Sequence, residues 1–234
     1  MSALTKALRR RLRGASDDGM SLVELIVVMM VSGVVLAIVG TMFVNVALVT
    51  SNANATTTRS SIAANVMNEM SKVIRTSSNN AVAGDDDPDP AIVSGTAKAL
   101  TVYSYVDTSA TAPAPTKVTF RVDANGNVFE DRVAGSVSGS FYVFTGATTT
   151  RPLGGPIIST SLFTYLDSAN AVVTPGATGL TLAQRNTVAS IKVTVTVANS
   201  VTYRTNSPGA PGNSPIVIEN TIGMPNLLLT GTDN

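Results

Sequence analysis

The chain has 234 residues and a net charge of +1, and only 13% of its residues are charged. This length allows one domain with a core and one further element, and the near-neutral charge favours neither a nucleic-acid-binding protein nor a protein with an acidic tail. The sequence contains no cysteine and no histidine, which excludes disulfides, metal sites built from thiolates or imidazoles, and imidazole-based acid–base catalysis.

A short basic segment, residues 1–19, opens the chain. It holds five basic side chains against two aspartates, whereas the residues after Gly19 carry 11 basic and 13 acidic side chains, a net charge of −2. The five basic residues are Lys6, Arg9, Arg10, Arg11 and Arg13. The basic character of the chain therefore belongs to this segment.

A long apolar run follows. Residues 25–44 contain no charged side chain, and a helix of about 20 residues crosses a hydrocarbon core of roughly 30 Å. A cleaved secretory signal has a shorter apolar region of about 7–15 residues and a small-residue cut site, for which residues 52–56 are a poor match. The run predicts a membrane-spanning helix over about residues 22–49, with the basic segment in the cytoplasm and the chain after about residue 50 outside.

One carboxylate, Glu24, lies at the start of this apolar run, between Val23 and Leu25. An ionised carboxylate that enters hydrocarbon costs a few kcal/mol unless it is paired, so such residues are usually functional. The position alone is equally compatible with a glutamate at the level of the lipid headgroups, close to water.

The residues around Glu24 resemble a known signature. The run GMSLVE, residues 19–24, follows a basic leader and precedes an uninterrupted apolar helix, as in type IV prepilins and type II secretion pseudopilins. The resemblance implies cleavage between Gly19 and Met20, N-methylation of Met20, and Glu24 as the fifth residue of the mature chain. It also implies two kinds of partner, a prepilin peptidase/N-methyltransferase and other pilin or pseudopilin subunits.

The resemblance also implies a role for Glu24 in assembly. In this family the glutamate of one subunit pairs with the N-terminal amine of its neighbour. Burying both charges together is tolerable, whereas one buried charge alone costs several kcal/mol. The pairing therefore acts as a register device, and the presence of Glu24 implies a subunit with another subunit above it.

A second apolar pattern follows the polar stretch 50–61. Apolar residues recur there at helical spacing and define one face of a helix. They are Ile62, Val66, Met70, Val73 and Ile74. The chain from residue 21 to about 77 is therefore expected to form one long helix whose second half packs on a globular head. The expected divisions are a cleaved leader (residues 1–19), the helix region (20–80) and an extracytoplasmic head (81–234).

Two acidic segments of the head have alternative interpretations. The loop Asp85–Asp89 has the carboxylates to bind Ca²⁺, although a solvated loop is favoured. Asp123, Asn125 and Asn127 have the spacing of the start of an EF-hand loop, but Gly126 comes too early for that motif. The flanking residues alternate like strands, which favours a β-hairpin turn.

The head contains several runs of alternating apolar residues that are typical of strands. The expected strands are residues 100–106, 117–122, 128–133, 140–145, 161–166, 190–197 and 216–220. Strands that follow one long helix predict an α+β fold in which the helix packs on an antiparallel β-sheet. The order of these pieces, with Phe163–Asp167 before the late strand 190–197, is similar to the larger minor pilins and the J-type minor pseudopilins.

These features predict a structural filament subunit, a minor pilin or pseudopilin of a type IV pilus or type II secretion-like system, and not an enzyme. The sequence indicates no cofactor, and it has no basic aromatic patch for nucleic acid. Two alternatives stay open: a pilus-displayed adhesin or binding head, and an envelope protein on a plain N-terminal signal anchor. The mature N-terminus separates them, because a plain anchor keeps the leader whereas a pilin begins at methylated Met20.

Overall fold

The computed structural model of the protein describes residues 20–83, 88–106, 113–198 and 215–226. The chain divides into two compact units, Met1–Ser51 and Asn52–Asn234. The boundary lies inside the long helix α2 (Leu22–Arg75), so the helix contributes one part to each unit.

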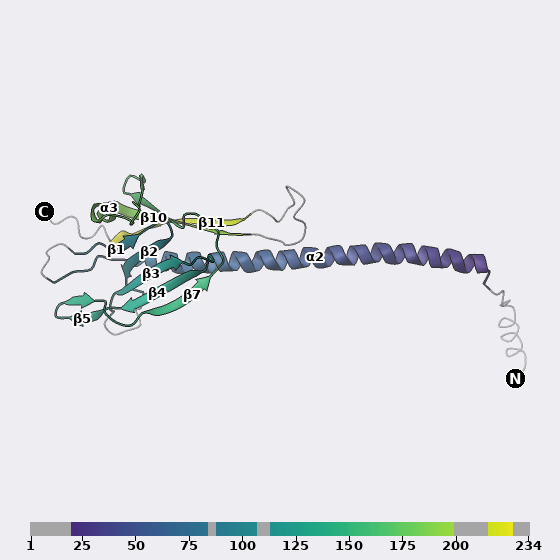
Figure 1. Ribbon diagram of the computed structural model, residues 1–234, viewed down its shortest axis with the longest axis horizontal. Coiled ribbons are helices and arrows are strands. Elements are labelled where there is room, and N and C mark those ends of the chain that lie inside the picture. Colours follow the sequence, from purple (N-terminus) through teal and green to yellow (C-terminus); the bar gives the residue numbers. More distant parts are fainter. Residues whose placement is uncertain (1–19, 84–87, 107–112, 199–214, 227–234) are drawn as a thin grey trace, which may run out of the picture. The chain divides into compact units, whose positions relative to one another are not determined.

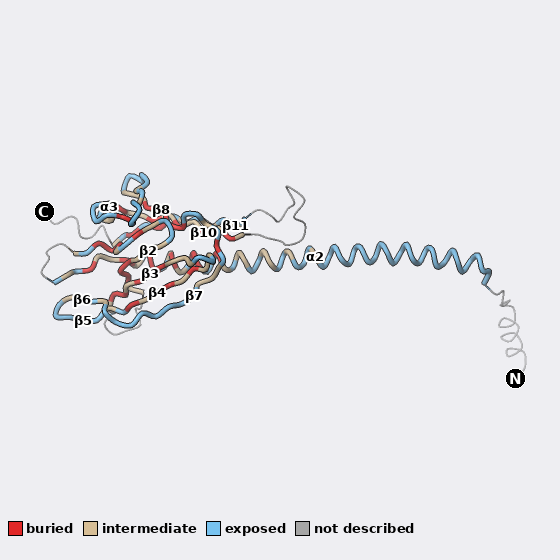
Figure 2. The backbone as a smooth tube through the Cα atoms, in the orientation of Figure 1, coloured by how far each residue is buried: buried red, intermediate tan, exposed pale blue. Residues whose placement is uncertain are grey.

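The first unit contains the N-terminal part of α2. Valine, isoleucine, leucine and methionine fill most positions there, and residues 20–47 are all exposed (Figure 2). The apolar side chains surround this part of the helix instead of forming one stripe, which is the pattern of a helix with an apolar environment on all sides.

In the structure the second part of α2 belongs to the same compact unit as the strands, and this unit, Asn52–Asn234, is called the head. Six of its residues are buried along one face: Ala63, Val66, Met67, Met70, Val73 and Ile74. The face predicted from the helical spacing is thereby confirmed, with Ile62 half-buried at its N-terminal end. The helix ends at Arg75, and the hydroxyl of Ser77 donates back to the carbonyl of Ile74 (2.6 Å).

A five-stranded antiparallel sheet packs on this part of the helix. In spatial order its strands are β1 (Ile92–Gly95), β2 (Ala99–Ser104), β3 (Thr116–Val122), β4 (Val128–Ala134) and β7 (Thr149–Gly154). Edge strand β7 approaches the helix closely, because a Cβ at Gly154 would lie only 2.7 Å from Cγ2 of Ile62. The φ of Gly154 is 147°, a value that side chains rarely allow, so glycine suits this position on both counts.

A four-stranded antiparallel sheet covers the other side of the helix (Figure 1). In spatial order its strands are β11 (Ile216–Gly223), β10 (Val188–Val197), β8 (Phe163–Asp167) and β9 (Val172–Val173). Two smaller elements complete the head, a hairpin of β5 (Ser136–Ser138) and β6 (Phe141–Val143) and the short helix α3 (Leu182–Thr187). A capping box between Thr181 and Gln184 starts α3.

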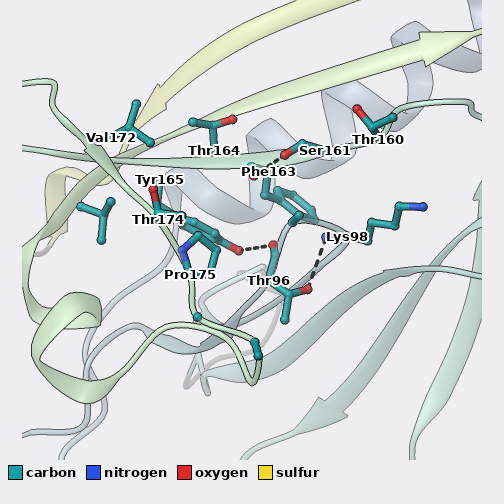
Figure 3. A pocket seen from close by; sticks show the side chains of 14 residues that line it. Thr96, Lys98, Thr160, Ser161, Phe163, Thr164, Tyr165, Val172, Thr174 and Pro175 are labelled. Atoms are coloured by element: carbon teal, nitrogen blue, oxygen red, sulfur yellow. Dashed lines mark hydrogen bonds between the residues drawn. The ribbon is translucent and has the colours of Figure 1, made fainter.

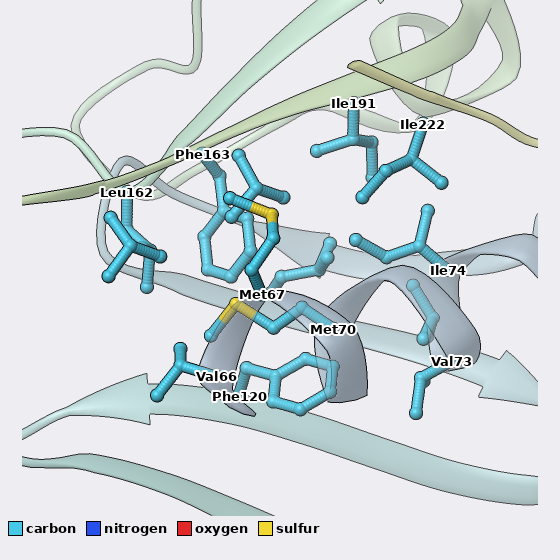
Figure 4. Packing of buried hydrophobic residues seen from close by; sticks show 14 of the residues in the cluster. Val66, Met67, Met70, Val73, Ile74, Phe120, Leu162, Phe163, Ile191 and Ile222 are labelled. Carbon is cyan, nitrogen blue, oxygen red and sulfur yellow. The ribbon is translucent and has the colours of Figure 1, made fainter. Parts of the chain in front are cut away.

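The hydrophobic core lies between the two sheets, around the C-terminal part of α2 (Figure 4). Phe120 of β3 lies on one side of the helix, and Ile191 of β10 and Ile222 of β11 lie on the other. All three side chains are fully buried, as is Met70 of the helix. The head is therefore a sheet–helix–sheet arrangement in which α2 is the middle layer.

The predicted α+β fold, a long helix packed on antiparallel sheet, is confirmed. Each expected strand overlaps an observed one, namely β2, β3, β4, β6, β8, β10 or β11. The sequence does not predict β1, β5, β7, β9 or α3. Strand β7 lacks apolar alternation and contains Pro152 and Gly154, which usually mark loops.

Of the two acidic segments, the one around Asp123 lies wholly within the described residues. Asp123 shapes the expected hairpin turn: its carboxylate accepts from the backbone N–H of Asn125 (2.9 Å) and of Asn127 (2.8 Å) and from the side-chain amide of Asn127 (2.9 Å). The hydrogen bonds from Asn127 hold the pKa of Asp123 below its usual value, which keeps this turn-forming carboxylate ionised. Most of the possible calcium loop, residues 85–87, lies outside the described residues, and Asp89 exchanges backbone hydrogen bonds with Asn80 (2.8 and 2.9 Å).

Candidate functional site

The region with the sequence signature begins immediately before α2. Met20 and Ser21 precede the helix, whose first turn closes when the N–H of Leu25 donates to the carbonyl of Ser21 (3.1 Å). Glu24 lies in this first turn, where unpaired N–H groups and the helix dipole favour a negative charge. Ser21 and Glu24 also have the spacing of a capping box, S-x-x-E before an apolar run.

The three residues expected to act in processing and assembly are Gly19, Met20 and Glu24. Gly19 lies outside the described residues. Met20 is 64% exposed, and Glu24 is exposed as well. Among the described residues, no ion pair includes Glu24. A carboxylate at this place needs a cation when its surroundings become apolar.

The apolar side chains around the first part of α2 form a continuous exposed surface. Every large apolar residue from Met20 to Val46 is exposed, and even the most covered of them, Leu25, exposes 40% of its surface. Contact between such a surface and water is unfavourable by roughly 25 cal/mol per Å². Within the described part of the chain, α2 is the helix that is long and apolar enough to cross a membrane.

A threonine-rich tract separates this surface from the buried part of α2. The hydroxyls of Thr56, Thr57 and Thr58 each donate to the carbonyl four residues earlier, at 3.0 Å. These bonds satisfy the hydroxyl groups within the helix, but they compete with the backbone ladder and tend to bend helices. The tract, residues 52–58, begins at the boundary between the two units. Helix α2 therefore has its weakest helix formers where its environment changes.

Inside the head, four charged residues join α2 to the five-stranded sheet. Glu130 of β4 is fully buried and accepts from Arg132 (2.8 Å) and Arg151 (2.6 Å). The same two guanidinium groups contact Glu69 of α2, at 2.8 and 3.0 Å. Burial of Glu130 is tolerable because two cations share its charge. The cluster fastens the helix to β4 and β7, and no local sequence pattern predicts it.

An open cavity of about 550 Å³ lies beside β8 and β9 (Figure 3). The side chains of Phe163 and Tyr165 line it, and the Tyr165 hydroxyl donates to the carbonyl of Thr96 (2.8 Å). Burial raises the pKa of Tyr165, so the hydroxyl remains a donor. Lys98 is the single charged residue among the lining residues, which therefore offer room for a small ligand but no acid–base pair.

Comparison with known families concerns the start of the chain. A family model, the prokaryotic N-terminal methylation motif, matches residues 15–40. The match includes Gly19, Met20 and Glu24 but covers only a small share of the chain. Comparison with curated proteins gives no match. Together with the exposed apolar part of α2, the motif indicates a type IV pilin-like precursor that is anchored in the membrane of the cell envelope. The proteins that carry this pilin-type motif are structural ones.

Proposed function

We propose that the protein is a structural subunit, a minor pilin or pseudopilin, of a type IV pilus or type II secretion-like filament. A prepilin peptidase/N-methyltransferase cuts the chain after Gly19 and methylates Met20. The proposal depends mainly on one observation: the exposed apolar part of α2 carries a single carboxylate, Glu24, in its first turn and within the methylation motif.

Before assembly, the apolar part of α2 is held in the cytoplasmic membrane. The basic residues of the leader favour a cytoplasmic position for residues 1–19, and this orientation supports an extracytoplasmic position for residues 81–234. Lipid then covers the apolar side chains that the head leaves exposed, and in the filament the helices of other pilin-like subunits replace the lipid.

Cleavage changes the charge at the start of the helix. Removal of the leader leaves an amine on Met20, close in sequence to Glu24. In the filament the carboxylate of Glu24 pairs with the amine of a neighbouring subunit, because either charge buried alone would be costly. A subunit in the wrong register would leave both charges unpaired.

Mass spectrometry of the protein extracted from cell envelopes tests this function. We expect a mature chain that begins at N-methylated Met20, and a chain that still begins at Met1 contradicts the proposal. A Gly19→Trp variant is expected to remain unprocessed, because the large side chain prevents close approach of the extended peptide to the peptidase. Wild-type gel mobility of that variant after exposure to the peptidase also contradicts the proposal.

The cavity of Figure 3 favours a second candidate function, a ligand-binding head displayed on the filament. Thr164 lines the cavity and is replaceable by a larger side chain. A Thr164→Trp variant that assembles normally but no longer attaches filaments to surfaces would support this function. Unchanged attachment would count against it.

A further inference from the structure

The two sheets of the head have four edges, and two of them are closed by simple means. Strand β9 is only two residues long. Strand β1 is covered, because the guanidinium of Arg185 donates to the carbonyls of Ile92 (3.2 Å) and Val93 (2.7 Å). The N–H of Leu180 donates to the carbonyl of Gly95 (2.9 Å). Such features keep an edge from pairing with another chain.

The third edge, β7, is blunted by a proline. The odd-numbered residues of β4 form the backbone hydrogen bonds to β3. The backbone groups of Glu130 and Arg132 therefore bond β7 on the other side. The residues of β7 opposite them are Arg151 and Thr149. The backbone nitrogen of Pro152 therefore points away from β4, towards the open side of β7. Because proline has no N–H, one hydrogen-bond donor is missing from this outer edge.

Strand β11 has none of these protections among the described residues. It is eight residues long, lies at the end of its sheet, and pairs with β10 along its whole length in an unbroken register. The strand contains no proline and no lysine, the residues that most often guard an edge.

One hydrogen bond shows which N–H and C=O groups of β11 point towards β10 and which point away from it. The N–H of Met224 donates to the carbonyl of Ala189 (3.1 Å), in the same register that pairs β11 with β10. Bonded and non-bonded pairs alternate in an antiparallel ladder, so the even-numbered residues of β11 bond β10. The odd-numbered residues, whose N–H and C=O groups point away from β10, are Val217, Glu219, Thr221 and Gly223.

The solvent face of β11, onto which the side chains of the odd-numbered residues project, is also open. Its four odd-numbered residues are exposed, and a Cβ added to Gly223 would meet no atom within 4 Å. On the other face of the strand, Ile216 and Ile218 are only half-buried, and an added strand would cover them. The matching segment is an extended peptide with apolar residues beside these isoleucines and small or polar residues on the solvent face.

We infer that the outer edge of β11 is an assembly surface that takes an extended strand from the head of a neighbouring filament subunit of different sequence. This inference rests on the proposed filament function. Strand addition satisfies the outward N–H and C=O groups of the four odd-numbered residues and extends the four-stranded sheet by one strand.

A second copy of the chain is a poorer occupant, because among the described strands its other long edge is β7, which contains Pro152. Two β11 strands could pair about a two-fold axis, but the direction of β11 opposes this arrangement. Val197, the partner of Ile216, lines a small cavity with Ala55 and Ile62 of α2. The start of β11 is therefore near the first turns of the helix in the head.

Farther along both elements, Asn220 of β11 donates to Ser71 of α2 (3.3 Å). Strand β11 therefore runs in the same direction as the helix. Antiparallel pairing of two β11 strands would turn the two copies of residues 52–75 in opposite directions. Subunits that enter their heads at Asn52 from one membrane cannot meet in this way.

Hydrogen exchange on the mature protein, with its helix and head intact, tests the inference. In the detergent-solubilised subunit we expect fast exchange at the odd-numbered amides of β11 and slow exchange at the even-numbered ones. In filaments the odd-numbered amides are expected to exchange at least about tenfold more slowly than in the isolated subunit, because opening then requires separation of the added strand. Fast exchange in filaments, or protection already in the isolated subunit, overturns the inference.

A proline substitution tests the same edge through assembly. Thr221→Pro removes an outward N–H but no bond to β10, and strand geometry suits a proline there. We expect at least about tenfold less incorporation into filaments than for Thr221→Ala, with similar thermal unfolding of both heads. Val217→Lys should also lower incorporation, whereas Val137→Lys, at an exposed valine of β5, should not. Equal incorporation within either pair overturns the inference.

Cross-linking identifies the occupant. The chain has no cysteine, so a photoreactive group on Thr221→Cys reports on one place only. Cross-links to an extended segment of a different subunit with a methylated N-terminus support the inference. Cross-links to residues 199–214 of the same chain, or to β11 of a second copy, overturn it.

The two proposals fail in different ways. A chain that begins at Met1 or never enters filaments contradicts the proposed function, and the inference with it. Normal filaments in which the odd-numbered amides of β11 stay in fast exchange contradict only the strand-addition inference.

Discussion

The two parts of helix α2 are both rich in valine and methionine, yet they lie in different environments. From Met20 to Val46 every large apolar side chain is exposed, whereas six residues between Ala63 and Ile74 are buried in the head. The first part has apolar residues on all sides, and the second part has them on one face. The distribution of apolar residues around the helix, and not their number, therefore tells which part depends on the head and which needs a membrane or other helices.

The largest difference between the two parts is expected from matched methionine substitutions. Met70 is fully buried and Met42 is 67% exposed. Met70→Ala should lower the free energy of unfolding of the head by about 2–5 kcal/mol, because it removes buried methylene groups and leaves a cavity. Met42→Ala should change it by less than about 0.5 kcal/mol. Urea unfolding in detergent measures both, and a similar loss for the two variants would remove the distinction.

Matched glutamate substitutions are expected to separate stability from assembly. Glu69→Gln weakens the contacts of α2 with Arg132 and Arg151 and should lower head stability by about 1–3 kcal/mol. Glu24→Gln should leave head stability and cleavage unchanged but impair entry into filaments. Thermal unfolding and the fraction of the protein in sheared filaments give the two readouts. Normal assembly of the Glu24 variant would contradict the pairing role.

Acid is expected to weaken the head more than the first part of α2, where Glu24 is the sole carboxylate between residues 20 and 51. The hydrogen bond from Arg121 holds the pKa of Asp131 below its usual value. A folded pKa below the unfolded value of about 3.9 means that the carboxylate stabilises the head fully above that value. This contribution is lost as the pH falls through the unfolded and then the folded pKa.

The corresponding test is Asp131→Asn. The variant should lower head stability near neutral pH, and its stability should fall less than that of the wild type between about pH 5 and pH 2. Unfolding curves at several pH values measure the difference. Parallel losses in the two proteins would show that other groups control the acid response.

The smallest effect is expected in the threonine tract. Alanine at Thr57 and Thr58 removes two β-branched residues whose hydroxyls bond the helix backbone. Each change should stabilise the helix by about 0.5 kcal/mol. Slower exchange of the amides of residues 52–58 would show this, and unchanged exchange would mean that the tract is held by contacts other than its own propensity.

Local patterns predicted much of this fold. The spacing of Val66, Met70 and Val73 marks the buried face of α2, and the alternation in residues 190–197 marks β10, because both depend on neighbours in sequence. Strand β11 was predicted only as far as residue 220, short of its observed end at Gly223. The methylation motif likewise lies within one short segment, so Gly19, Met20 and Glu24 could be singled out as candidates.

The features that depend on tertiary structure could not be predicted. Glu69, Glu130 and Arg151 come from three different elements, and no local pattern connects them. The open edge of β11 also depends on the whole head, since it is recognised only when the guarded edges beside it are known.

Two polar contacts of α2 determine its rotational setting within the head. Glu69 and Ser71 are two positions apart and so lie on nearly opposite flanks, because successive residues are separated by about 100°. Glu69 bonds Arg132 of the five-stranded sheet, and Ser71 bonds Asn220 of the four-stranded sheet. Rotation of residues 52–75 by even one position would break both contacts together. Torque applied to residues 52–75 therefore acts on both sheets at once.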